Sequence, residues 1–63
     1  MEEINQSGML QRNVEEFSRL QSYMSLTEKS SAAYKAMKVR YVELKVILTA
    51  TGINLSQLDI INE

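Results

Sequence analysis

Residues 25–28 read Ser-Leu-Thr-Glu, and they decide between two folds for this chain of 63 residues. Ser25 and Glu28 have the spacing of a capping box, in which both side chains bond to backbone amides at the start of a helix. If this box begins a new helix, the chain folds into a tight helical hairpin with almost no linker. If it does not, residues 9–51 form one continuous helix of more than forty residues.

The apolar stripes on either side of this junction differ in phase, which favours the hairpin. The seven-residue frame of a first helix over residues 9–24 continues onto polar positions, and the apolar frame resumes one residue out of register. A seam that loses its apolar residues and returns out of phase indicates a break, although the junction contains neither Gly nor Pro. We therefore expect a second helix over residues 26–51 and an intramolecular core of Leu10, Val14, Phe17, Met24, Tyr34, Met37, Tyr41, Leu44 and Leu48.

Composition predicts an all-α protein that associates with itself. The chain has no Pro and two Gly, so few residues interrupt helices. A core of this size rarely supplies more than ~3–5 kcal/mol. The sequence has no Cys and no His, which removes disulfides and zinc as means of stabilisation. We expect a homodimer or tetramer in which the hairpins form a helical bundle with coiled-coil packing.

The second expected helix has two apolar faces, and this is the most informative feature of the sequence. Opposite the core stripe lies a second stripe, made of Val39, Val42, Val46 and Ala50. Scattered exposed apolar residues are ordinary, but four on one stripe are more than scatter. We expect this stripe to be a protein interface for a second copy or another protein, with Leu58 and Ile61 either masking or joining it.

The C-terminal stretch Thr51–Glu63, TGINLSQLDIINE, resembles the second half of a helix-turn-helix. Gly52 suits the end of the long helix, and Asn54 or Ser56 could cap a short third helix over residues 55–61. That segment contains no Lys or Arg, whereas DNA-reading helices present polar or basic side chains to bases and phosphates. We expect a latch instead, with Leu55, Leu58 and Ile61 covering an apolar stripe.

The residue types present point away from enzymatic chemistry. Without His or Cys, and without a glycine-rich phosphate loop, we expect no catalytic, cofactor or metal site and no small-molecule substrate. With a net charge of −1, the chain lacks the excess of basic residues typical of nucleic-acid-binding proteins. Lys35, Lys38 and Lys45 would form only a weak basic patch. No apolar run is long enough to span a membrane, and we expect a cytoplasmic protein.

These observations predict a non-enzymatic protein-interaction module, a regulator, adaptor or assembly factor, which works through an apolar helical face. Its expected partners are itself and/or another protein. The alternative is a small nucleic-acid-binding regulator that uses the helix-turn-helix-like C-terminus or a lysine-bearing bundle face. No residue motif singles out one family.

Overall fold

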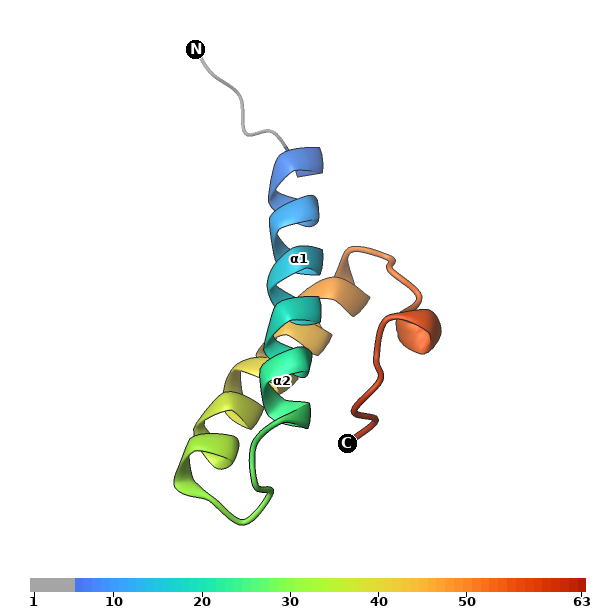
Figure 1. Cartoon of the computed structure of the whole chain (residues 1–63). Coiled ribbons are helices and arrows are strands. Elements are labelled where there is room, and N and C mark those ends of the chain that lie inside the picture. Colours follow the sequence, from blue (N-terminus) through green and yellow to red (C-terminus); the bar gives the residue numbers. More distant parts are fainter. Residues whose placement is uncertain (1–5) are drawn as a thin grey trace.

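The computed structural model describes residues 6–63 and is an all-α helical hairpin, as the phase shift predicted. Helix α1 spans Gln6–Ser25, helix α2 spans Ala32–Ala50, and a single 3-10 turn, η1, spans Leu55–Gln57. The two helices pack against each other, and the C-terminal segment folds back beside them (Figure 1). The described residues contain no strand.

The hairpin turns at a different place from the expected capping box. Ser25 is the last residue of α1, and residues 26–31 form the linker. Ser31 caps α2, because its Oγ accepts a hydrogen bond from the amide of Tyr34 at 3.0 Å. Ser25 instead donates its own Oγ to the carbonyl of Ser22 at 2.7 Å. The spacing rule selected the wrong serine because a box at Ser25 competes with a last helical turn that this serine completes.

Helix α2 ends in a Schellman motif at Gly52, as the sequence predicted for that glycine. Gly52 has a φ of +89°, and the amide of Ile53 donates to the carbonyl of Leu48 at 3.0 Å. The amide of Gly52 donates to the carbonyl of Thr49 at 3.0 Å, which completes the pair of bonds that closes such a terminus. The chain therefore reverses here, and Ile53 packs against the core.

The third helix is shorter than residues 55–61. Asn54 caps η1 by accepting a hydrogen bond from the amide of Ser56 at 2.9 Å, and the helix ends after Gln57. Residues 58–63 then run on as a tail beside both helices (Figure 1). The amides of Ile60 and Ile61, which a longer helix would use internally, bond to the side chain of Gln21.

One core joins α1, α2 and the tail. Six of its apolar side chains are buried: Phe17, Met24, Tyr34, Tyr41, Leu44 and Leu48. The rings of Phe17 and Tyr41 stack with centroids 5.6 Å apart and planes 9° apart, in a range where aromatic pairs add to area burial. Partly buried apolar side chains complete the cluster, among them Leu10, Val14 and Met37. All nine residues expected in the core therefore lie in this cluster.

Candidate interaction surface

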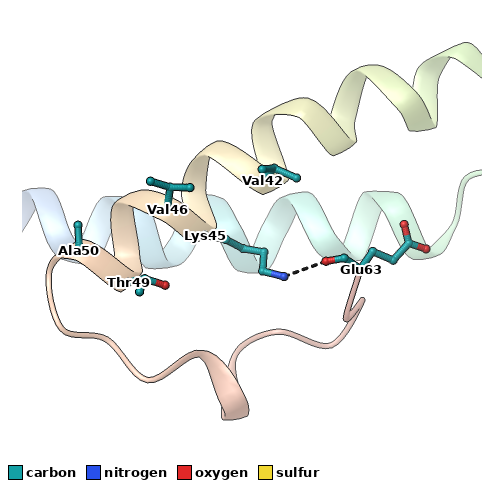
Figure 2. A pocket seen from close by; sticks show the side chains of 6 residues that line it. All are labelled: Val42, Lys45, Val46, Thr49, Ala50 and Glu63. Carbon is teal, nitrogen blue, oxygen red and sulfur yellow. Dashed lines mark hydrogen bonds between the residues drawn. The ribbon is translucent and has the colours of Figure 1, made fainter.

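The valine stripe of α2 lies on the surface of the protein, opposite the core. Val39 is 62% exposed, Val42 45% and Val46 65%, and Ala50 is exposed as well. Val42 and Val46 point away from the C-terminal tail, whereas Lys45 reaches toward it (Figure 2). We call these four residues the valine face. Together they form an apolar strip along the solvent-exposed side of α2.

Two shallow hollows follow the valine face along α2. One is lined by Val42, Lys45, Val46, Thr49, Ala50 and Glu63 (Figure 2). The other is lined by Lys35, Lys38, Val39, Val42 and Glu43. Both are open toward solvent and mostly apolar, so they suit protruding side chains of a partner protein better than an enclosed small molecule.

Two alanines extend the valine face toward the start of α2, and the sequence reasoning missed them. Ala32 and Ala36 are exposed, and helical spacing places both within about 60° of Val39 around the axis. The signal was available, since both positions follow the 3.6-residue period. An alanine by itself, however, says little about burial, so the pattern does not single out these two positions.

Leu58 and Ile61 do not belong to the valine face. Both are partly buried and pack against the hydrophobic core, together with Ile53 and Leu55. Their packing on the core gives no support to the expectation that they mask or join the interface, and that expectation stays a prediction. The latch itself is present: Leu55, Leu58 and Ile61 all contact the core cluster.

Gln21 fastens the tail to α1, and it is the one buried polar residue of the described chain, with 1% exposure. Its Nε2 donates to the carbonyl of Leu58 at 2.8 Å. Its Oε1 accepts from the amides of Ile60 at 2.6 Å and Ile61 at 2.9 Å. One side chain thus satisfies three backbone groups of the tail. The sequence gave no sign of this role, because a Gln on a helix is most often a solvated residue.

Tyr41 and Lys45 fasten the tail to α2. The hydroxyl of Tyr41 donates to Oδ1 of Asp59 at 2.6 Å and accepts from the amide of Glu63 at 3.0 Å. Lys45 pairs with Oδ2 of Asp59 at 3.0 Å and lies over the Tyr41 ring, 5.0 Å from its centroid. It also donates to the backbone oxygen of Glu63 at 2.9 Å (Figure 2). The ring of Tyr41 is buried in the core, while its hydroxyl bonds to the tail at both Asp59 and Glu63.

These contacts move the titration of the groups involved. Burial disfavours ionised Asp59, but hydrogen bonds from Tyr41, the Asn62 amide and Lys45 outweigh it and hold the pKa of Asp59 below 3.8. Burial, followed by the hydrogen bond to Asp59, raises the pKa of Tyr41 above 10.0. The hydrogen bond to Asp59 raises the pKa of Lys45 above 10.5. At neutral pH the cluster is an ion pair bridged by a neutral phenol.

The side chain of Glu63 ties the end of the tail to the linker and to the first half of α2. Its carboxylate lies 3.0 Å from Lys38 and 3.3 Å from Lys29, and it accepts a hydrogen bond from Tyr34 at 3.3 Å. Hydrogen bonding to Lys38 and then to Lys29 lowers the pKa of Glu63 below 4.5. Lys29 is in the linker, so the tail contacts every segment of the hairpin.

A separate ion pair, away from the tail, joins α1 to α2. Arg40 donates Nε to Glu16 at 2.8 Å and Nη2 to the same carboxylate at 2.9 Å, a two-pronged geometry. Its Nη1 donates to Glu43 at 3.2 Å. The hydrogen bond from Arg40 holds the pKa of Glu16 below 4.5. The pair is half exposed, so it fixes the register of α1 on α2 more than it adds stability.

The lysines that sequence grouped as a weak nucleic-acid footprint have different surroundings. Lys38 pairs with Glu63, and Lys45 pairs with Asp59. Lys35 makes no ion pair within the described residues and lies beside the valine face. Two of the three positive charges are therefore matched by carboxylates of the tail.

Residues 6–63 offer no group of three or more carboxylates that could hold a metal ion. In the same part of the chain, neither helix combines the length and apolar character needed to cross a membrane. Comparison with protein-family models, with curated proteins and with solved structures found no match.

Proposed function

We propose that this protein is a small, non-enzymatic interaction module whose binding surface is the valine face of α2, and that its partner is a second copy of the chain. The observation that carries the proposal is the exposure of Val39, Val42 and Val46 on a helix whose other face is already covered. Helix α1 and the apolar residues of the tail lie on the core side, and Glu63 alone of the tail borders the valine face. These three side chains therefore keep about half or more of their surface exposed.

The energetics favour a weak, reversible complex. Covering a valine that is half to two-thirds exposed contributes roughly 1–2 kcal/mol, so six valines from two chains contribute roughly 6–12 kcal/mol. Association costs an estimated ~4–15 kcal/mol in lost freedom of the two chains. The two terms nearly balance. Such a surface suits a regulator, adaptor or assembly factor whose association responds to concentration.

Light scattering over a dilution series tests the proposal, with Val42→Asp as the disrupting variant. The wild-type mass is expected to rise with concentration toward that of a dimer, whereas Val42→Asp stays monomeric. Val42 is half exposed, so this variant should keep its helical circular dichroism. Leu26→Asp is the matched control: it adds the same charge at an 86% exposed apolar residue of the linker and should associate like the wild type.

A wild-type protein that remains monomeric at every concentration would contradict self-association. A Val42→Asp variant that associates like the wild type would show that the contact lies elsewhere. The nucleic-acid alternative has less support, because η1 is a single turn and the tail carboxylates engage Lys38 and Lys45. The expected cytoplasmic location stays a prediction.

A further inference from the structure

The exposed face of α2 is graded in size and charge about a single residue, Val39. On its N-terminal side the exposed apolar residues of this face are Ala32 and Ala36, and on its C-terminal side they are Val42 and Val46, with Ala50 following at the end of the helix. Within two turns of Val39, small side chains thus occupy one half of the face and larger ones the other. Two like halves placed together would either clash or leave a gap, whereas unlike halves fill the space between two helices.

Two opposite charges on the same face lie at equal distances from Val39 along the chain. Lys35 precedes Val39 by four residues, and Glu43 follows it by four. Both are exposed and line the hollow that contains Val39. The ammonium of Lys35 has no ion-pair partner in residues 6–63, and Glu43 is held by a single exposed bond to Arg40. Each charge is therefore available to a partner that places an oppositely charged side chain at the same height along α2.

We propose that the second copy packs on α2 in the antiparallel direction, with a two-fold axis at Val39. This arrangement deepens the proposed function and rests on it. It places Lys35 level with Glu43 of the partner subunit, and by symmetry the same pair forms twice. It also places Ala36 level with Val42 of the partner subunit, and Ala32 level with Val46 of the partner subunit.

A parallel dimer has none of this complementarity. It would set Lys35 beside its own copy and Glu43 beside its own copy, two like-charge contacts that oppose association. It would also pair alanines with alanines at one end, which leaves a gap between the helices. The antiparallel contact involves far fewer residues than the roughly 20–30 per side of a standard interface, in keeping with a weak dimer.

Disulfide trapping tests the orientation, because the chain has no cysteine of its own. In Val39→Cys the two thiols meet at the axis, and mild oxidation should give a covalent dimer. Ala50→Cys is the matched control on the same exposed face. Eleven residues at about 1.5 Å each put it about 16 Å from the axis, so its two copies are about 33 Å apart. Disulfides require Cα atoms within about 7 Å, and this variant should stay uncrosslinked.

Charge exchange is the second measurement. Lys35→Glu or Glu43→Lys alone should weaken the dimer roughly tenfold or more, since each substitution turns two attractions into repulsions. The double variant restores both pairs with reversed sign and should dimerise within about threefold of the wild type. In a parallel dimer, Lys35→Glu would only exchange one like-charge contact for another, and the double variant would rescue nothing.

The outcomes separate this inference from the function on which it rests. A wild-type monomer at all concentrations overturns both. A wild-type dimer in which Ala50→Cys crosslinks as readily as Val39→Cys overturns the antiparallel orientation and leaves self-association standing. A dimer that traps at Val39→Cys but ignores all charge exchanges overturns the register defined by Lys35 and Glu43.

Discussion

Replacing Gln21 with Met removes the side-chain amide that fastens the tail and leaves a side chain of similar length. The amides of Ile60 and Ile61 and the carbonyl of Leu58 then lose their partner, which now lies 2.6–2.9 Å away. Because Gln21 is 1% exposed, water cannot replace the amide while the tail stays docked. The tail must either keep three unpaired groups or leave the groove.

The magnitude follows from the number of bonds. Three hydrogen bonds at a net ~0.5–1.5 kcal/mol each give roughly 1.5–4.5 kcal/mol. The apolar Met side chain recovers ~1 kcal/mol by its own burial, so we expect a loss of roughly 0.5–3.5 kcal/mol, centred on about 2 kcal/mol. For a domain of this size, each kcal/mol corresponds to roughly 4–8 °C in Tm. If the tail detaches, the loss equals the free energy with which it docks.

Urea unfolding gives the global loss, and amide hydrogen exchange at Ile60 and Ile61 gives the local one. The Gln21→Met variant should lose protection at both amides even where the helices stay protected. Ser22→Ala is the control: its exposed Oγ bonds only within α1, to the carbonyl of Ser18 at 3.2 Å, so it should stay within about 0.5 kcal/mol of the wild type. Unchanged protection, with a loss below about 0.5 kcal/mol, would refute the role given to Gln21.

Two further predictions concern the tail carboxylates and the helix cap. The pKa values of Asp59 and Glu63 lie below 3.8 and 4.5 in the folded state, so their stabilisation is present above these values and lost as the pH falls through the folded pKa values. Asp59→Asn should flatten that acid decline in urea unfolding at several pH values, and an unchanged decline would count against the tail network. Ser31→Ala should cost about 1 kcal/mol in the same assay, because it removes the cap of α2. Ser25→Ala should cost less, and the reverse order would contradict the assignment of the cap.

The hairpin was predictable because the spacing of apolar residues along each helix does not depend on where the turn begins and ends. The shift of frame between Phe17 and Tyr34 required a break, and the structure places a linker between them. The exact turn was not predictable in the same way. The chain offers three serines near the turn, Ser25, Ser30 and Ser31, and only the packing of α1 on α2 decides which of them caps the second helix. Cap rules rank residue types but cannot choose among identical neighbours.

The tail was predictable in its apolar part and not in its polar part. Leu58 and Ile61 are hydrophobic and had to find a surface, which proved to be the core groove. Gln21, Tyr41 and Asp59 meet from three separate segments, and no spacing within one helix reveals such a contact. The length of the last helix failed for the same reason, since bonds to Gln21 replaced the bonds of a longer helix.

The tail and the valine face are adjacent, so their equilibria are linked. Glu63 and Lys45 line the same hollow as Val42 and Val46 (Figure 2). Lys38 lines the other hollow, together with Val39. While the tail is docked, Glu63 and Asp59 neutralise these lysines, and Lys35 and Glu43 set the remaining charge of the face. If the tail detaches, Lys38 and Lys45 lose their carboxylate partners and leave two unpaired positive charges at the edge of the valine face. These charges would repel the same lysines of a second copy. If docking of the tail strengthens dimerisation by some free energy, dimerisation must strengthen docking of the tail by the same amount, because coupling between two equilibria is reciprocal.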